Sequence, residues 1–240
     1  MCGTALPKPR VSFATIFKIF GCLGLLAVLA AIALPGFVAS GRASNDRCAS
    51  SSIKTLATAE ADFRANDRDG NHINDYWTGD VAGLYCIAPG ADGPDRANAI
   101  KLIEISMASA DSDPLKGVTR PPYVPVESFT NQGAKAGYWY WALRADASVV
   151  PSAPYRQEPK DDPPSSRHYN TSRFGFIAYP DNVRSGRAIF IINEGYTMFK
   201  RPNDEALRPS TRVPPGPITR PGFLDWPSDA ILQRNWERMN

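Results

Sequence analysis

The stretch Leu29-Ala-Ala-Ile-Ala-Leu-Pro35 closes an apolar run that carries no charged residue from Ile19 to Ala39. A polar segment of helix-forming composition follows it directly. Because an α-helix rises about 1.5 Å per residue, about 20 residues are enough to cross the hydrocarbon core of a membrane. The apolar run has that length, and we therefore predict a transmembrane helix over residues 19–39.

The charges on the two sides of this run predict its orientation. No acidic residue occurs among the first forty residues, whereas acidic and basic residues are mixed after the run. The basic residues before it are Lys8, Arg10 and Lys18. Positively charged flanks stay preferentially in the cytoplasm. We therefore expect residues 1–18 to be a cytoplasmic N-terminus and the rest of the chain to lie outside.

A cleaved secretory signal peptide is the alternative interpretation of the same run. A signal peptide also has a basic start, an apolar centre and small residues after it, and Val38-Ala39-Ser40 could be its cleavage site. The run is longer than an ordinary signal core, which favours retention in the membrane. Both interpretations place the remainder of the chain outside the cytoplasm.

The polar segment after the run has the periodicity of an amphipathic helix. From Ala49 to Asn66 it contains no glycine or proline. Its apolar residues recur every three to four positions, which puts them on one helix face. We predict that residues 40–66 form the exterior half of the same helix, laid against a sheet, and that Gly70 ends it with a positive φ. The apolar positions are Ile53, Leu56, Ala59 and Phe63.

Four later segments have the aromatic and β-branched composition of strands. They are Tyr138–Leu143, Arg173–Tyr179, Arg187–Ile192 and Tyr196–Lys200, the last two joined by a turn at Asn193-Glu194-Gly195. The pattern also predicts a strand at Leu84–Ile87, a helix at Asp95–Ala110 and a short helix at Asp229–Arg238. The 22 prolines cluster in loops between these elements. The expected organisation is an α+β head over residues 67–202 with Pro-rich loops, and a Pro-rich C-terminal tail over residues 203–240.

Several of these segments resemble a known family. The string Leu29–Pro35 is similar to the N-terminal spine of type IV pilins and type II secretion pseudopilins, which carry a proline at the equivalent point. The segment Thr55–Arg64 is similar to the second half of the pseudopilin spine, an alanine-rich helix that ends in an aromatic residue. Farther along, Phe174–Pro180 and Phe190–Gly195 resemble the last strands of secretion-protein-G-like heads.

The resemblance implies a pilin-like α+β fold, in which a long N-terminal helix, membrane-spanning in its first half, packs on a small antiparallel β-sheet. It implies a single-pass protein of the bacterial inner membrane, with its N-terminus in the cytoplasm and its head in the periplasm. The implied function is that of a membrane-anchored structural or interaction protein associated with type II secretion or type IV pilus machinery. The expected partners are membrane lipid, through residues 19–39, and other pilin-like subunits or the secretion machinery.

The chain departs from the family at the processing site. Counted back from Pro35, the mature N-terminus would be Ala14, with a glycine before it and a glutamate four residues later. This chain has Phe13 in place of the glycine and Lys18 in place of the glutamate. A prepilin peptidase needs the small residue, so we expect no processing. A lysine cannot neutralise a neighbouring N-terminus in a filament core, where an unpaired charge is costly. A pilin-like protein that stays in the inner membrane fits better than a filament subunit.

The charge balance and the cysteines allow further predictions about partners and disulfides. The 27 basic and 24 acidic residues nearly balance, which gives no reason to expect nucleic acid as a partner. Cys48 and Cys86 lie in the part expected outside the cytoplasm, where disulfides form. They could be joined by a disulfide that ties the helix to the head, or they could be two unpaired small residues. No cysteine pair has the spacing of a metal site.

An acidic loop follows the helix and is the candidate metal site. Asp67, Asp69, Asn71 and Asp75 supply the oxygen ligands that calcium prefers, which makes calcium the candidate cofactor. The spacing departs from that of an EF-hand loop, because no register has both the central glycine and the final glutamate. A solvated turn that ends the helix is the interpretation we favour.

The sequence gives little support for catalysis. The histidines are His72 and His168, and the paired carboxylates Asp161 and Asp162 lie in a Pro-rich stretch. There is no nucleophile motif and no glycine-rich phosphate loop, so we predict that the chain is not an enzyme. The segment Tyr138-Trp139-Tyr140-Trp141 could be an aromatic binding face, but packing in the core is favoured for such a strand. A secreted or anchored extracytoplasmic module that binds an unknown ligand is the alternative function.

Overall fold

The computed structural model describes residues 13–68, 70, 72–85, 87, 100–114, 132–143, 145–146, 153–154, 169–203, 225–226, 232–234 and 236–239. The chain divides into two compact units, Met1–Gly41 and Arg42–Asn240. The second unit is called the head below.

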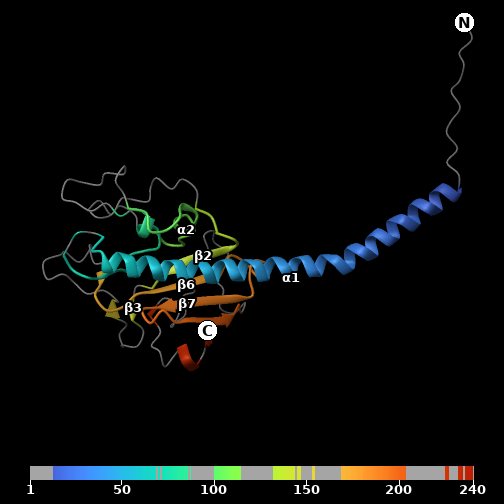
Figure 1. The fold of residues 1–240 in the computed structure, drawn as a ribbon. Helices are drawn as coiled ribbons and strands as arrows, with labels where there is room; N and C mark the ends of the chain where they lie inside the picture. The colour runs from blue at the N-terminus through green and yellow to red at the C-terminus, as the bar shows by residue number, and fades with distance from the viewer. Residues whose placement is uncertain are drawn as a thin grey trace, which may run out of the picture. The chain divides into compact units, whose positions relative to one another are not determined.

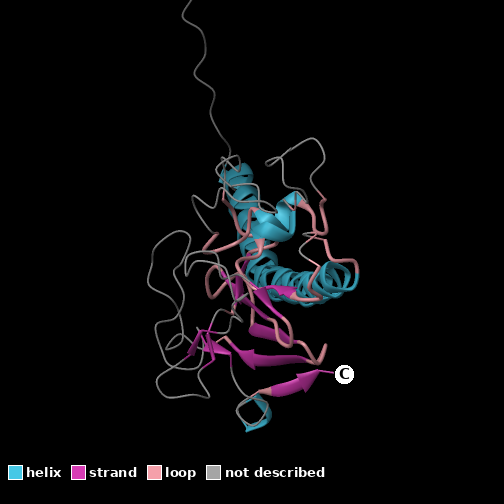
Figure 2. Ribbon diagram, turned by 90° about the vertical axis from the view of Figure 1, so that its left-hand side faces the viewer, coloured by secondary structure: helices cyan, strands magenta, loops and turns pink. Residues whose placement is uncertain are grey.

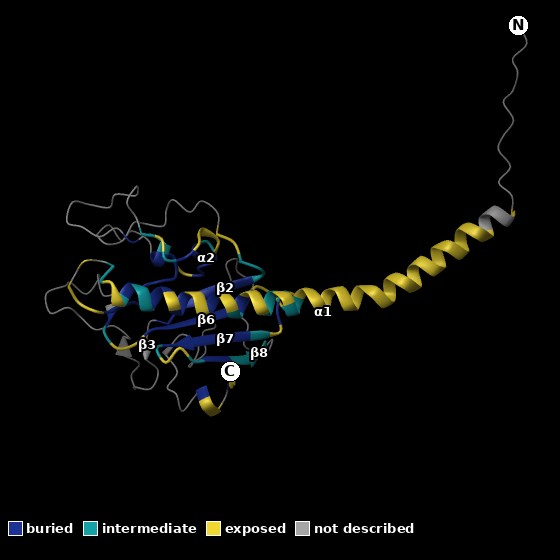
Figure 3. Ribbon diagram, in the orientation of Figure 1, coloured by how far each residue is buried: buried dark blue, intermediate teal, exposed yellow. Residues whose placement is uncertain are grey.

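Helix α1 (Phe13–Ala65) is the longest element and contributes residues to both units. No residue in its most apolar 18-residue window is buried, and the large hydrophobic side chains of this part are exposed (Figure 3). By length and composition the helix could cross a membrane, as a signal sequence near the N-terminus also could. The predicted long apolar helix is confirmed, with Pro35 inside it and a positive φ of 69° at Gly70 after it.

The head is built on a five-stranded antiparallel sheet with the strand order β10-β8-β7-β6-β2 (Figure 1). The four predicted segments from Tyr138 to Lys200 correspond to β2, β6, β7 and β8. The Tyr196 N–H donates to Asn193 O at 2.8 Å and closes the predicted turn between β7 and β8. The bounds are β2 (Tyr138–Ala142), β6 (Gly175–Pro180), β7 (Ala188–Asn193), β8 (Met198–Pro202) and β10 (Glu237–Met239).

The central strands carry the residues that a buried pleated surface favours. Every residue of β2 is buried, and so is every residue of β6. Because successive side chains of a strand point to opposite faces, complete burial means that both faces of the sheet are covered there. The aromatic segment Tyr138–Trp141 therefore belongs to the core, which is the interpretation favoured from the sequence.

The part of α1 inside the head covers one face of the sheet (Figures 1 and 2). The four predicted apolar positions, Ile53, Leu56, Ala59 and Phe63, are 0%, 0%, 4% and 1% exposed. Fully burying a large apolar side chain contributes about 1.5–3 kcal/mol. This stripe therefore fixes the helix on the sheet, and the long helix with an antiparallel sheet makes an α+β arrangement.

Two small sheets and two short helical turns complete the described part of the head. Strand β1 (Tyr76–Trp77) pairs antiparallel with β5 (Tyr169–Asn170). Strand β3 (Ala145–Asp146) pairs with β4 (Ala153–Pro154) and, in parallel, with β9 (Asp225–Trp226). The 3₁₀ helix η1 (Ala82–Tyr85) and helix α2 (Ile105–Ala108) lie between β1 and β2 in the sequence.

The predicted strand at Leu84–Ile87 is wrong. Ala82–Tyr85 form η1, and Ile87 makes an isolated bridge to another loop. The Asp111 carboxylate accepts hydrogen bonds from two consecutive backbone N–H groups at the start of η1, at 2.7 and 2.8 Å. The helical turn is therefore held by a residue about 30 positions away, which the local pattern does not reveal.

The predicted helix at Asp95–Ala110 is mostly wrong. Helix α2 has four residues, residues 100–104 before it are not helical, and residues 95–99 lie outside the described residues. The Leu102 N–H donates to Leu84 O at 2.9 Å. Pairing with the η1 segment uses a backbone group that a helix would need, and this tertiary contact outweighs the helical periodicity.

Within the predicted C-terminal tail, residues 203–240, the structure describes short segments that pack on the head. Of the predicted helix Asp229–Arg238, residues 232–234 are helical, and β10 then pairs with β8 at the edge of the sheet. Leu232 and Trp236 are 0% and 8% exposed. Burying these two side chains draws the segment to the core, and β10 then pairs the backbone along β8, which would otherwise be an open sheet edge.

Candidate functional site

The structure describes two of the four predicted calcium ligands, Asp67 and Asp75, whereas Asp69 and Asn71 lie outside the described residues. Asp67 lies in the turn after α1, has a positive φ of 44°, and accepts a hydrogen bond from the His72 N–H at 3.0 Å. Asp75 is only 2% exposed. Among the described residues, no group of three His, Cys, Asp or Glu side chains could hold a metal ion. Calcium binding stays a prediction.

The other polar residues singled out in the sequence are not brought together. The His72 side chain is 95% exposed, with its Nδ1 3.6 Å from an Asp67 carboxylate oxygen. His168 and the pair Asp161–Asp162 lie outside the described residues. The described part of the chain therefore contains one of the two histidines, in a solvated turn.

The structure describes one of the two cysteines of the predicted disulfide, Cys48. Cys48 lies in α1 as an exposed, free thiol, and Cys22 is likewise exposed in the apolar part of the helix. Cys86 lies outside the described residues. The Cys48–Cys86 disulfide stays a prediction.

Glu60 is an ionisable side chain buried in the head core, with 0% exposure. Its Oε2 accepts a hydrogen bond from the Trp77 N–H at 2.9 Å, which joins α1 to β1. Burial raises the pKa of the Glu60 carboxyl well above its ordinary value, the Trp77 hydrogen bond lowers it, and the nearby Asp75 raises it. The Glu60 side chain is therefore neutral over a wider pH range than an exposed glutamate.

Two more buried carboxylates organise the loop after β1. Asp80 accepts hydrogen bonds from the Gly83 N–H at 2.7 Å and from the Trp77 indole N–H at 3.1 Å. Asp111 accepts hydrogen bonds from the N–H groups of Val81, just before η1, of Ala82, its first residue, and of Asp113. These carboxylates bind backbone and indole donors, so their geometry is that of structural supports.

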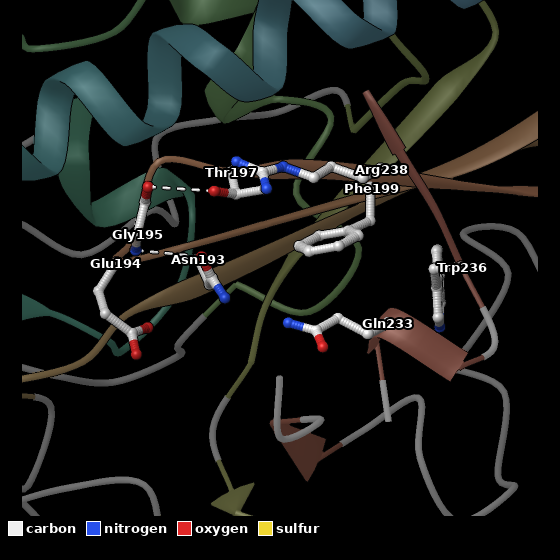
Figure 4. Close-up of a pocket in the computed structure, with 8 residues that line it drawn as sticks. All are labelled: Asn193, Glu194, Gly195, Thr197, Phe199, Gln233, Trp236 and Arg238. Atoms are coloured by element: carbon white, nitrogen blue, oxygen red, sulfur yellow. Dashed lines mark hydrogen bonds between the residues drawn. The ribbon is translucent and has the colours of Figure 1, made fainter. Parts of the chain in front are cut away.

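A pocket of about 530 Å³, here called the turn pocket, lies beside the β7–β8 turn (Figure 4). Figure 4 shows the Phe199 ring and the Gln233 amide at its centre, with the Glu194 carboxylate on one side and Trp236 on the other. The Gly195 N–H donates to the Asn193 side chain at 3.0 Å and fixes the turn. The volume is that of a small-ligand site, but the two aromatic rings are largely buried.

A second pocket of about 380 Å³, here called the basic groove, lies where α1 meets β7, β8 and β10. It contains four basic and two acidic side chains and therefore has a positive excess. Lys200 and Glu237 pair across β8 and β10 at 2.9 Å. The charged residues of the groove are Arg47, Arg187, Lys200, Arg201, Asp46 and Glu237.

Asp46 joins three segments at the wall of the basic groove. Its Oδ1 accepts hydrogen bonds from the Tyr138 hydroxyl at 2.6 Å and from the Arg187 backbone N–H at 3.0 Å. Ala188 O lies 2.8 Å from the same hydroxyl. Burial, and then the hydrogen bond to Asp46, raise the pKa of Tyr138 above its ordinary value. Because Asp46 already accepts these two hydrogen bonds, the charge that the groove offers to a ligand is mainly that of its basic side chains.

The described residues contain no arrangement that by itself identifies a reaction. No protein-family model, curated protein or solved structure matches the sequence. What the head does is therefore inferred from its own residues and fold.

Sequence reasoning missed both pockets, because their residues come from segments far apart in the chain. Asp46 and the Arg187 N–H are 141 positions apart and meet at hydrogen-bond distance. The available signal is the basic residues at the ends of two predicted strands, Arg187 and the pair Lys200-Arg201. Their position at strand ends indicates that they lie at one edge of the sheet, but not that α1 passes there.

Proposed function

We propose that this chain is a membrane-anchored, pilin-like protein with a structural or interaction role, associated with a type II secretion or type IV pilus apparatus. Helix α1 carries the proposal. Its first part exposes an apolar surface along its most apolar 18-residue window, while its second part carries a buried stripe that packs on an antiparallel sheet. An uncovered apolar helix of that length is stable in lipid, where its backbone groups are satisfied internally.

The proposed location is the bacterial inner membrane, with a cytoplasmic N-terminus and a periplasmic head. The basic residues before the apolar run and the absence of acidic ones support this orientation. Phe13 and Lys18 support an anchor that is neither processed nor assembled into a filament. The head would then act through contacts with other proteins or with the membrane.

The N-terminal sequence and intact mass of the protein from native membranes test this proposal. An uncut chain starting at Met1 and resisting extraction by alkaline carbonate is the expected result. Cleavage just before Ala14 would contradict the unprocessed anchor and restore a standard pseudopilin. Cleavage near Gly41 with a soluble product would contradict the anchor itself.

The turn pocket favours a second candidate function, an extracytoplasmic module that binds a small ligand. Its volume of about 530 Å³ and its mixture of Phe199, Gln233, Glu194 and Arg238 fit a polar organic molecule with an apolar part. A soluble product cut near Gly41, together with a co-purifying small molecule seen by mass spectrometry, is the result that would favour this candidate. A soluble head without such a molecule would count against it.

A further inference from the structure

We propose that the basic groove binds the phosphate-bearing headgroup of an anionic phospholipid of the membrane in which the chain is anchored. The proposal rests on the anchoring proposed above. It assigns a ligand class to a surface of the head, lined partly by the segment of α1 that follows the apolar run.

The charge of the groove selects an anion. Its four basic side chains exceed its two acidic ones, and one acid, Asp46, already accepts two hydrogen bonds from within the fold. Arg47 and Arg187 are exposed, so their guanidinium groups can reach a ligand from solvent. Arginine binds phosphate oxygens with paired N–H donors, which gives a phosphate both charge and geometric complementarity.

The apolar part of the groove suits the rest of a lipid headgroup. Ala188, Phe190 and Met239 line it beside the basic residues. A volume of about 380 Å³ accommodates a phosphate with its glycerol, but not extended acyl chains, which would remain in the bilayer. The groove therefore offers an anion-binding rim and an apolar wall to a molecule that has both chemical parts.

The short chain connection allows the groove to approach the membrane. Asp46 follows Ala39, the last residue of the predicted transmembrane segment, by seven residues. A fully extended chain spans at most about 3.3–3.6 Å per residue, so these seven residues reach less than about 25 Å. Basic residues close to an anionic bilayer surface are attracted to it, and this attraction fades within about one Debye length, about 8 Å. The connection therefore allows the groove to approach the bilayer surface, whatever the placement of the two units.

The experiment is a titration of the full-length chain in a neutral maltoside detergent, followed by microscale thermophoresis. The probes are dihexanoyl phosphatidylglycerol, dihexanoyl phosphatidylcholine, inorganic phosphate and a polyglutamate peptide. Saturable binding of the phosphatidylglycerol, with no binding of the zwitterionic lipid, is expected. Each substitution removes a donor to the phosphate, and a typical hydrogen bond contributes about a fivefold effect. Arg47→Gln and Arg187→Gln should therefore each weaken binding about fivefold.

Lys54→Gln is the matched control, because Lys54 is an exposed basic residue of the same helix that does not line the groove. It should leave the affinity unchanged, and thermal unfolding should show that all three variants are folded. Equal binding of both lipids, or equal loss in the control, would overturn the proposal. Equal affinity for inorganic phosphate, or tighter binding of polyglutamate, would overturn the lipid assignment in favour of a free anion or an acidic protein segment. Because the short-chain lipids bind in solution, this result does not depend on whether the anchor is cleaved.

Discussion

Glu60 carries a carboxyl group into the core of the head, and its environment has a measurable consequence for stability. Its pKa in the folded head is raised, mainly by burial, above the ordinary value of 4.5 that applies when the chain is unfolded. Between these two pKa values the folded protein binds the proton more tightly than the unfolded chain does. The free energy of unfolding must therefore fall as the pH rises through this window.

We predict that Glu60→Gln removes this loss. The amide oxygen of glutamine can still accept the Trp77 N–H, but it carries no titrating proton. The unfolding free energy of the variant should then be less dependent on pH above about 4.5 than that of the wild type. Urea unfolding of the full chain in detergent, followed by tryptophan fluorescence at several pH values, measures the difference.

Asp62 is the control, because its pKa is shifted in the opposite direction to that of Glu60. The hydrogen bond from Arg68 lowers the pKa of Asp62, so its contribution is present above its unfolded pKa and is lost as the pH falls through the folded value. Asp62→Asn should make the unfolding free energy less dependent on pH at acidic pH, and should leave its pH dependence above about 4.5 unchanged. Parallel curves for the wild type and Glu60→Gln above that pH would refute the role given to burial.

Tyr138 is the second residue with a specific prediction. Tyr138→Phe removes the hydroxyl that donates to Asp46 and leaves that carboxylate with the Arg187 N–H. Asp46 is half-buried, and losing a hydrogen bond to a charged group costs about 1.5–3 kcal/mol of the unfolding free energy. Tyr196→Phe is the control, because Tyr196 is 49% exposed and its hydroxyl bonds an uncharged partner, Tyr76, so its loss should cost about 1 kcal/mol or less. Similar losses for both variants in urea unfolding would show that the Asp46 contact adds nothing.

At the scale of elements, α1 should respond differently to the same substitution in its two parts. Phe63 is 1% exposed and packs in the head core, whereas Phe37 is 74% exposed. Phe63→Ala should lower the unfolding free energy of the head by about 3–5 kcal/mol, because it leaves a cavity in a packed core. Phe37→Ala should leave the thermal transition of the head unchanged in detergent. A comparable loss from both would contradict the division of α1 into an exposed part and a head-packed part.

The elements that the sequence predicted well are those with a strong local pattern. The stripe through Ile53 and Phe63 repeats at helical spacing, and the strands β2, β6 and β7 are rich in aromatic residues and isoleucine. Such patterns indicate burial directly, because a segment this apolar has no stable exposed conformation in water.

The elements that the sequence did not predict correctly are held by residues far away in the chain. Helix η1 depends on the Asp111 carboxylate, and the segment before α2 is paired through Leu102 to Leu84. Strand β10 forms because Leu232 and Trp236 are buried in the core. A local window contains none of these partners. The basic groove could not be predicted for the same reason, because it forms where four elements that are separated in the sequence meet.

At the scale of the whole molecule, the orientation of the chain can be tested through Cys48, which is exposed in α1 after the apolar run. In a chain whose other cysteines are replaced by serine, a membrane-impermeant maleimide added to spheroplasts should label Cys48 before lysis. A matched chain that keeps only Cys2 should be labelled after lysis alone, because residues 1–18 are expected in the cytoplasm. The reverse pattern would invert the proposed topology.

In the chain that retains all cysteines, the same label also tests the predicted disulfide. If Cys48 is joined to Cys86, labelling of Cys48 should require a reductant. Labelling of equal extent with and without reductant would show that Cys48 is a free thiol, as the structure has it.

The hydrogen bonds around Asp46 also determine when the head can form during synthesis. The side chains of Asn45 and Asp46 meet partners 140, 92 and 141 positions later in the chain, at Ser185, Tyr138 and Arg187. The helical stripe of Ile53 and Leu56 is therefore made long before the strands that bury it. Contacts between such distant segments form slowly, because a long loop must close first. In the anchored chain that we propose, the stripe is until then an amphipathic surface tethered beside a bilayer, and the membrane interface is the nearest apolar phase that can shield it from aggregation.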